Sequence, residues 1–188
     1  MEGNDTLALM PTGGGKSITF QVPALAQDGI CIVITPLIAL MRDQVERLKE
    51  MDIKAMAIHS GMTRHEIDIA LDNCIFGGYK FLYISPERIE TDLFQARVQK
   101  MKVNLVAIDD AHCISQWGYD FRPSYLKIVQ IRDYLSARPP FLALTATATT
   151  RVVEDIREKL AFKDSKVIRA GFERKKPRIL VQRSGGKA

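Results

Sequence analysis

TLALMPTGGGKS, residues 6–17, joins an apolar run to three glycines, a lysine and a serine. Glycines let the backbone turn sharply and point successive N–H groups at an anion. Lys16 is placed to reach the β and γ phosphates of a nucleotide, and Ser17 offers a hydroxyl to Mg²⁺. The helix expected to begin here adds the positive end of its dipole. The stretch therefore predicts a strand, a loop and a helix, with phosphates held by Thr12, Gly13, Gly14, Gly15, Lys16 and Ser17.

The loop departs at one position from the strict phosphate-loop pattern, which has Gly where this chain has Met10. The simpler alternative is a glycine-rich turn that only caps a helix. The required context of strand, loop and helix favours the nucleotide site.

Short apolar runs alternate with longer amphipathic stretches along the chain. The apolar runs are nearly continuous, as in strands covered on both faces. They lie at residues 6–10, 30–35, 55–59, 80–85, 104–109, 141–147 and 166–170. Helical patterns lie between them, at residues 16–26, 37–51, 64–76, 92–101, 124–137 and 149–161. This alternation predicts a three-layer α/β domain over residues 1–168 with a mostly parallel central sheet, whose ligands bind at the carboxyl ends of the strands.

The net charge of +5 is unevenly distributed. Residues 169–188 hold seven Lys or Arg and one Glu, a net of +6, so residues 1–168 carry −1. We interpret this basic tail as a solvated linker, with phosphate contacts by residues 173–178 as the alternative.

The cysteines and histidines give no sign of a metal cluster. The three cysteines are far apart and odd in number, which argues against a disulfide framework. His59, His65 and Cys113 lack partners at ligand spacing, so we interpret them as structural residues. The sequence shows no signal-peptide pattern and no apolar run of membrane-spanning length, so we expect a cytoplasmic protein without a membrane partner.

Two acids follow an apolar run within IDDAHCISQWGYDFRP, residues 108–123. Asp109 is placed to hold Mg²⁺, and Asp110 to orient or deprotonate an attacking water. His112 is expected to hydrogen-bond across to residues 145–147. Two acids after a strand are common by chance, but together with the phosphate-binding loop they predict a site that hydrolyses a nucleotide.

Five stretches occur in an order that resembles a known family. They are MPTGGGKS (10–17), TPLIALMRDQV (35–45), YISPER (83–88), DDAHCISQWGYDFRPSY (109–125) and LTATAT (144–149). Together they look like the first motor domain of a RecQ-type DNA helicase of superfamily 2, over nearly the whole chain. The resemblance implies a RecA-like P-loop NTPase fold, ATP with Mg²⁺ as ligands, and 3′-to-5′ unwinding of duplex DNA.

The resemblance also implies roles for single residues. The catalytic groups are matched by Lys16, Asp109, Asp110 and His112, and the metal-holding groups by Ser17 and Asp109. The groups that couple the ATP state to DNA are matched by Thr145 and Thr147. The family's aromatic-rich loop, which senses single-stranded DNA, is matched by Gln116, Trp117, Phe121 and Arg122. The segments that contact the DNA backbone are matched around Pro36 and Arg88.

The DNA-binding assignments have structural alternatives. Trp117 and Phe121 are candidates for the hydrophobic core, although they lie in a loop punctuated by Gly, Asp and Pro. Arg88 is a candidate for an ion pair with Glu87 or Glu90 on a helix surface.

Two residues depart from the family pattern. Asp110 stands where the family carries Glu, and Tyr119 where many relatives carry His. The Asp side chain is one methylene shorter, so its carboxylate is set back by about 1.5 Å, and a misplacement of about 1 Å costs on the order of 10²-fold in rate. We therefore expect nucleotide binding to persist and turnover to be slow.

Parts that the family carries on either side have no counterpart in this sequence. They are an upstream segment that reads adenine and a second RecA-like domain, whose arginine finger supplies about 10³–10⁵ in rate. We expect a monomeric fragment that works with that domain, binds single-stranded and partly duplex DNA, and does not unwind DNA alone. Its DNA partner implies the nucleoid in a bacterium or the nucleus in a eukaryote. Rival functions are a DEAD-box RNA helicase, which residues 114–125 disfavour, and a nucleotide-dependent binding module without hydrolysis.

Overall fold

The computed structural model describes residues 3–11 and 15–169. In that part of the chain seven strands form one sheet, in the order β3-β4-β2-β5-β6-β1-β7. The strands are β1 (Thr6–Leu9), β2 (Ile30–Ile34), β3 (Ala55–Ile58), β4 (Phe81–Ile84), β5 (Val103–Ile108), β6 (Phe141–Thr145) and β7 (Lys166–Arg169). Neighbouring strands run parallel throughout, which confirms the predicted sheet. Their carboxyl ends therefore lie along one edge.

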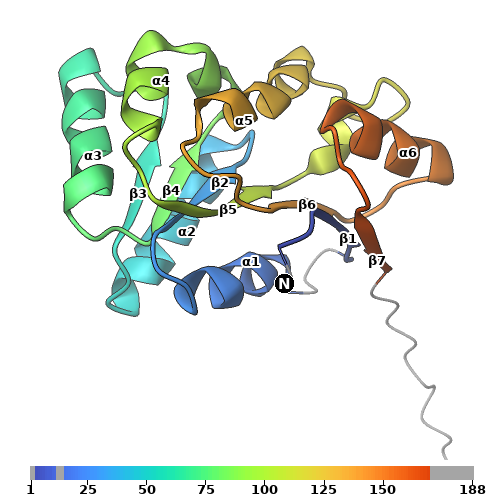
Figure 1. Ribbon diagram of the computed structural model, residues 1–188, viewed down its shortest axis with the longest axis horizontal. Coiled ribbons are helices and arrows are strands. Elements are labelled where there is room, and N and C mark those ends of the chain that lie inside the picture. Colours follow the sequence, from blue (N-terminus) through green and yellow to red (C-terminus); the bar gives the residue numbers. More distant parts are fainter. Residues whose placement is uncertain (1–2, 12–14, 170–188) are drawn as a thin grey trace, which may run out of the picture.

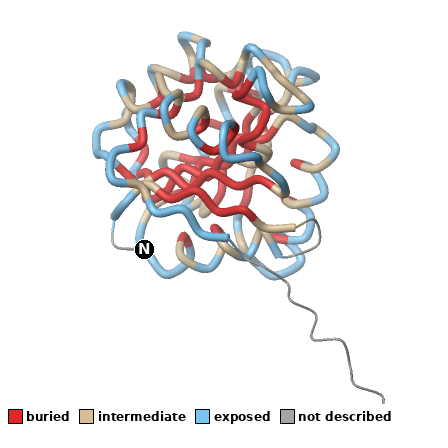
Figure 2. The backbone as a smooth tube through the Cα atoms, turned by 90° about the vertical axis from the view of Figure 1, so that its right-hand side faces the viewer, coloured by how far each residue is buried: buried red, intermediate tan, exposed pale blue. Residues whose placement is uncertain are grey.

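Helices cover both faces of the sheet (Figure 1). One face packs against α1 (Lys16–Leu25) and α2 (Ile38–Glu50) in one apolar cluster. The other face packs against α3 (Arg64–Phe76), α4 (Asp92–Val98), α5 (Ile131–Tyr134) and α6 (Thr150–Lys159) in a second cluster. Figure 2 shows the buried backbone concentrated in the strands between them. These are the three layers that the sequence predicts. Among the described helices, none is long and apolar enough to cross a membrane.

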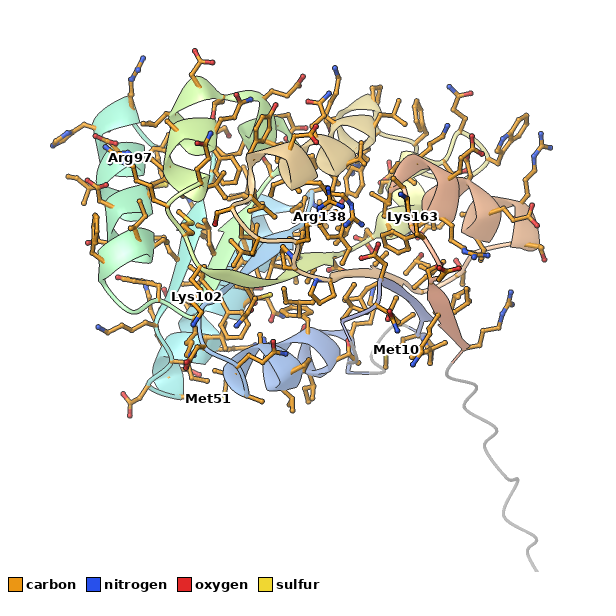
Figure 3. The ribbon with its side chains drawn as sticks, in the orientation of Figure 1. Met10, Met51, Arg97, Lys102, Arg138 and Lys163 are labelled. Atoms are coloured by element: carbon orange, nitrogen blue, oxygen red, sulfur yellow. The ribbon has the colours of Figure 1, made fainter. Side chains whose placement is uncertain are left out.

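Packing between α3 and α4 includes an ionic contact. Arg97, labelled on α4 in Figure 3, places its Nη1 2.6 Å from Asp72 Oδ1 and pairs through Nη2 with Asp68. Both carboxylates are more than a third exposed, and such pairs contribute about 0–1 kcal/mol. The layer therefore depends chiefly on its apolar contacts.

Residues 124–137, predicted as one helix, form a 3₁₀ helix followed by a short α-helix. The 3₁₀ helix, η3, runs over Pro123–Gln130 and leads into α5. Tyr125, Ile128 and Ile131 are buried at every third position, which fits the three-residue turn of a 3₁₀ helix better than the 3.6-residue turn of an α-helix. Two further 3₁₀ turns follow strands without a signal in the sequence: η1 (Pro86–Glu90) and η2 (Ala111–Ile114).

Strand β7 forms one edge of the sheet and pairs only with β1 among the described strands. All four of its residues are exposed. Arg169, predicted as the first residue of the tail, is the last residue of this strand. The rest of the predicted tail, residues 170–188, lies outside the described residues.

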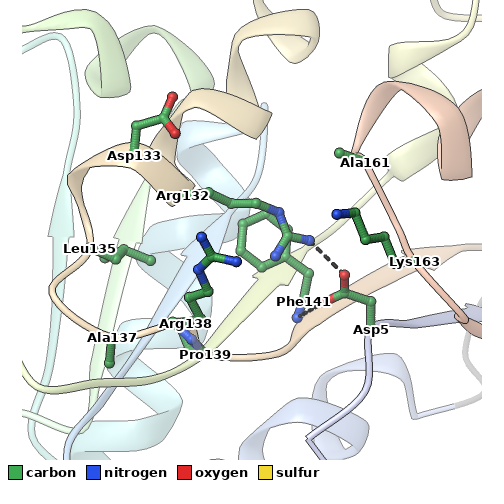
Figure 4. A pocket seen from close by; sticks show the side chains of 10 residues that line it. All are labelled: Asp5, Arg132, Asp133, Leu135, Ala137, Arg138, Pro139, Phe141, Ala161 and Lys163. Atoms are coloured by element: carbon green, nitrogen blue, oxygen red, sulfur yellow. Dashed lines mark hydrogen bonds and ion pairs between the residues drawn. The ribbon is translucent and has the colours of Figure 1, made fainter.

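Asp5, just before β1, joins the amino end of β1 to α5 through an ion pair and to the amino end of β6 through a hydrogen bond (Figure 4). Arg132 Nη2 lies 2.7 Å from Asp5 Oδ2, and Asp5 Oδ1 accepts a hydrogen bond from the Phe141 N–H at 2.9 Å. The guanidinium also stacks on the Phe141 ring, 3.6 Å from its centroid. These groups border a cavity of about 280 Å³. Because Asp5 and Phe141 stand where their strands begin, this cavity is at the opposite edge of the sheet from the carboxyl ends.

The three cysteines are buried and free. Burial raises the pKa of Cys74 and of Cys113 to about 12, and it raises the pKa of Cys31 further. All three thiols therefore stay protonated near neutral pH.

Replacing Asp5 with alanine is expected to lower the free energy of unfolding by about 1–3 kcal/mol, because the Phe141 N–H and the Arg132 guanidinium lose a shared acceptor. Urea unfolding followed by circular dichroism measures this change. Asp28→Ala is the control, since Asp28 is exposed and forms only a long ion pair, 3.9 Å from Lys102. This substitution should change the free energy of unfolding by less than about 0.5 kcal/mol. Equal effects of the two substitutions would contradict the anchoring role of Asp5.

Candidate nucleotide and nucleic-acid site

Helix α1 begins at Lys16, directly after the glycines of the predicted phosphate-binding loop. Gly15 has a φ of 75°, in the left-handed region that glycine adopts without strain. The N–H groups in the first turn of a helix lack partners within the helix and suit an anion. Gly15, Lys16 and Ser17 therefore lie at the start of a helix, where an anion could bind, whereas Thr12, Gly13 and Gly14 lie outside the described residues.

Lys16 lies between the two predicted acids. Its Nζ is 3.6 Å from Asp109 Oδ1 and 3.6 Å from Asp110 Oδ1. Asp109 follows β5, and its N–H donates to the Ile34 carbonyl oxygen at 2.9 Å, which continues the pairing of β5 with β2. The three charged side chains are between 16% and 25% exposed. The sheet thus brings together three residues that the sequence predicts to be catalytic.

The backbone turns sharply at Asp110. Its φ of 49° and ψ of 43° lie in the left-handed region, and its N–H donates to Asp109 Oδ1 at 3.0 Å. Asp and Asn adopt this conformation more readily than longer side chains do. The turn directs the short carboxylate of Asp110 toward Lys16.

The site carries an excess of negative charge. Burial raises the pKa of Asp109, and the neighbouring Asp110 raises it further, while Lys16 opposes both effects. One ammonium group therefore faces two carboxylates in a partly buried setting. The carboxylates and the Ser17 hydroxyl are oxygen donors, the ligands that Mg²⁺ prefers. The residues present thus fit a divalent cation, whose charge would offset the excess.

A cavity of about 230 Å³ lies beside these charges. Phe20 of α1 and Leu40 of α2 line it, together with Thr35 and Tyr83 from the ends of β2 and β4. The Thr35 hydroxyl is buried and has no hydrogen-bond partner among the described residues. Thr35 and Tyr83 have no role among those predicted from the sequence, although each begins one of the motif stretches. Their hydroxyl groups within otherwise apolar runs were the available signal.

His112 connects η2 to the end of β6. Its Nδ1 is 3.0 Å from Thr145 Oγ1, and both side chains are buried. The Thr145 hydroxyl donates its hydrogen to the Thr147 carbonyl oxygen at 3.2 Å, so His112 Nδ1 must be the donor to Thr145. Burial lowers the pKa of His112, and its ring is neutral at pH 7. The hydrogen bond predicted between His112 and residues 145–147 is confirmed.

The loop after η2 exposes its aromatic side chains. Trp117 is 57% exposed and Tyr119 is 75% exposed, so the alternative that Trp117 belongs to the core is wrong. The backbone N–H of Trp117 donates to Ser115 Oγ at 3.2 Å. Tyr119 stacks on the His112 ring with the two centroids 4.3 Å apart. Gln116, directly before Trp117, is also exposed.

The far end of this loop is held by Arg122. Its Nη2 lies 2.9 Å from Asp120 Oδ2, and its backbone N–H donates to the Cys113 carbonyl oxygen at 2.8 Å. Phe121 is half-buried. Folding brings His112, Cys113 and Asp120 within 4.8 Å of one another, which the sequence spacing did not reveal for Cys113. Asp120 is already paired with Arg122, so we interpret this cluster as structural.

Pro36 and Arg88, the other predicted DNA contacts, follow the neighbouring strands β2 and β4. They therefore lie along the same edge of the sheet as the acids. Arg88 forms no ion pair within the described part of the chain, and Glu90 pairs with Lys127 at 3.4 Å. The alternative in which Arg88 pairs with Glu87 or Glu90 is wrong.

Comparison with protein families agrees with this geometry. The family model described as DEAD/DEAH box helicase matches residues 1–156. The chain belongs to the DEAD/DEAH box helicase family. Among curated proteins of this kind, the ATP-dependent DNA helicase RecQ of Bacillus subtilis is 48% identical over 170 residues, which cover 90% of this chain and 29% of that protein. RecQ of Haemophilus influenzae is 40% identical over 182 residues, covering 97% and 29%. The chain spans less than a third of the length of these relatives.

Solved helicase structures share the fold of this DEAD/DEAH box domain. The Pyrococcus furiosus Hef helicase domain superposes with a TM-score of 0.65 at 19% identity, over 89% of this chain and 35% of that one. The yeast DEAD-box splicing factor Prp28 gives 0.67 at 20% identity, over 90% and 42%. The predicted RecA-like fold is thereby confirmed.

Replacing Asp109 with asparagine is expected to raise the thermal midpoint of the nucleotide-free DEAD/DEAH box domain by a few degrees. Because the folded-state pKa of Asp109 is raised, folding disfavours its ionised form. This cost is absent below the unfolded pKa of about 3.9 and complete above the folded pKa. The midpoint gain should therefore be full at about pH 8 and shrink toward about pH 4.

Thermal unfolding across this pH range measures the effect. Asp43→Asn is the control, since Asp43 is an exposed carboxylate on α2, and its midpoint should follow that of the unmodified chain. A lower midpoint for Asp109→Asn at about pH 8 would show that the carboxylate stabilises the empty site.

Proposed function

We propose that this chain is the ATP-binding motor domain of a RecQ-type 3′-to-5′ DNA helicase, which couples ATP hydrolysis to single-stranded DNA binding and duplex unwinding. The observation that supports this most is that one short turn, η2, joins the two acids beside Lys16 to His112, which is hydrogen-bonded to Thr145, and leads directly into the exposed Trp117. Identity of 40–48% to proteins named DNA helicases supports DNA as the nucleic acid.

The proposed ligands of the first part of this path are ATP and Mg²⁺. Gly15 and the first turn of α1 would bind the phosphates, and Lys16 would bind their β and γ oxygens. Ser17 and Asp109 would hold the metal ion, which would supply positive charge to stabilise the phosphates. Without nucleotide, Lys16 neutralises the acids. With nucleotide bound, Lys16 would pair with the phosphates, and the carboxylates would be available to a cation.

Asp110 is the proposed base. Its carboxylate contacts the same ammonium group, that of Lys16, as the carboxylate of Asp109 does. It therefore faces the space where the γ phosphate would bind. There it orients a water molecule and accepts its proton. The short side chain keeps the charge but reaches less far than Glu, which supports slow turnover rather than loss of ATP binding.

Coupling to DNA proceeds through the turn that carries Trp117. A base of single-stranded DNA stacks on this exposed indole, a contact that tolerates any sequence. The Gly118 N–H donates to the Ser115 carbonyl oxygen at 3.1 Å, and a Cβ at Gly118 would lie only 2.6 Å from the His112 carbonyl oxygen. A displacement of the turn is therefore transmitted to His112, and from there to Thr145.

The wider assembly is also part of the proposal. Pro36 and Arg88 contact the DNA backbone along the edge of the sheet. A second RecA-like domain of the same full-length, monomeric protein closes over the nucleotide, in keeping with relatives more than three times as long as the matched region. Such a protein acts at the nucleoid of a bacterium or in the nucleus of a eukaryote.

Substitution of Asp110 by Glu is expected to raise a Lys16-dependent ATPase rate by up to about 10²-fold, because the longer side chain restores reach. Phosphate release by this chain, Asp110→Glu and Lys16→Ala, with and without oligo(dT), tests this. Lys16→Ala should be inactive in every condition. Tight ATP binding without turnover in both the unmodified chain and Asp110→Glu would favour the non-hydrolysing binding module instead.

Truncation of Trp117 to alanine is expected to raise the half-saturating oligo(dT) concentration about tenfold, since stacking of one base contributes about 1–3 kcal/mol. Fluorescence anisotropy of a labelled oligonucleotide measures the affinity. Phe76→Ala is the control, because Phe76 is 80% exposed on α3 and should leave the affinity unchanged. Stronger binding of oligo(U) than of oligo(dT) by the unmodified chain would revive the RNA helicase reading.

A further inference from the structure

Arg151, in the first turn of α6, covers a face of Trp117. Its guanidinium carbon lies 3.3 Å from the centroid of the indole ring. Both residues are exposed, and Arg151 forms no ion pair among the described residues. A cation on an exposed aromatic face is attracted by the ring quadrupole, an effect of about two- to fivefold in an equilibrium constant. The indole that is best placed for a base is thus already occupied by a side chain of the same protein.

Trp117 also lines a groove of about 380 Å³ between the loop and α6. Tyr119 and His112 line it on the loop side, and Thr147 and Thr149 line it on the α6 side. The Arg151 contact is what holds the exposed indole next to α6. It therefore keeps the two sides of this groove together.

The loop that carries Trp117 and helix α6 are also connected by hydrogen bonds at the buried end of the groove. His112 donates to Thr145, whose hydroxyl donates to the Thr147 carbonyl oxygen. Two residues later, Thr149 Oγ1 accepts from the Val152 N–H at 3.4 Å and caps α6. The loop and α6 are therefore connected in two ways. One is the buried path of hydrogen bonds from His112 to the α6 cap, and the other is the exposed contact of Arg151 with Trp117.

We propose that Arg151 is a clasp that competes with a base of single-stranded DNA for the face of Trp117. This inference rests on the proposed function. In the DNA-free protein the clasp holds the 115–119 turn against α6. A stacking base displaces the guanidinium, and the released turn is then free to move the backbone beside His112. Arg151 thereby sets the DNA concentration at which the motor responds and holds the loop in its unstimulated position without DNA.

Trp117 is the one tryptophan of the chain, so intrinsic emission reports directly on this ring. Titration of the whole chain with oligo(dT), followed by tryptophan emission, gives the half-saturating concentration. Arg151→Ala should lower it about two- to fivefold, even though a positive charge is removed. Arg151→Gln, a polar replacement of similar length, should do the same and serves if the alanine variant folds poorly. Both variants should also hydrolyse ATP faster than the unmodified chain when no DNA is present.

Lys163→Ala is the matched control. It removes the same charge from an exposed residue beside the cavity at the opposite edge of the sheet, so it should weaken oligo(dT) binding slightly or leave it unchanged. If DNA alters the emission but Arg151→Ala binds no more tightly than Lys163→Ala, the clasp is refuted and the proposed function stands. If oligo(dT) changes neither the emission nor the ATPase rate of the unmodified chain, the DNA-coupled function fails, and the clasp with it.

Discussion

The contact of Lys16 with Asp109 and Asp110 depends on the parallel order of the sheet. The lysine follows β1 and the acids follow β5, and β6 lies between these two strands. Only because all three strands end at one edge can the ammonium group span the intervening strand and reach both carboxylates at 3.6 Å. Placing two partly buried acids beside one lysine is unfavourable for folding, and perturbed ionisable groups of this kind are concentrated at functional sites.

The same edge explains how the proposed nucleotide site and the loop that carries Trp117 come to be connected. The chain leaves β5 at the acids, passes through one 3₁₀ turn, and presents Trp117 to solvent within a few residues. His112 is the inward side chain of that turn, and its hydrogen bond to Thr145 binds the turn to the adjacent β6. A short, buried connection with this hydrogen bond is suited to transmit a displacement, as the proposed coupling requires.

Sequence patterns predicted the strands and the main helices because buried parallel strands are continuous apolar runs. They pointed to the acids and the phosphate-binding loop because ligands bind where such strands end. They failed where packing between distant segments decides the outcome. In the 3₁₀ helix η3 every third residue is buried, and in the sequence this spacing is hard to distinguish from that of an α-helix. The contacts of Trp117 with Arg151 and of Asp5 with Arg132 join residues far apart in sequence, so no local pattern reveals them.

The buried, protonated thiols have a practical consequence. Thiolate is the species that reacts with maleimides and iodoacetamides, and Cys31, Cys74 and Cys113 offer almost none of it at neutral pH. A cysteine introduced on the surface would therefore be labelled selectively, with the native cysteines left in place. A pair of dyes, one on the aromatic loop and one on α6, would then report loop opening in single molecules of an otherwise unaltered protein.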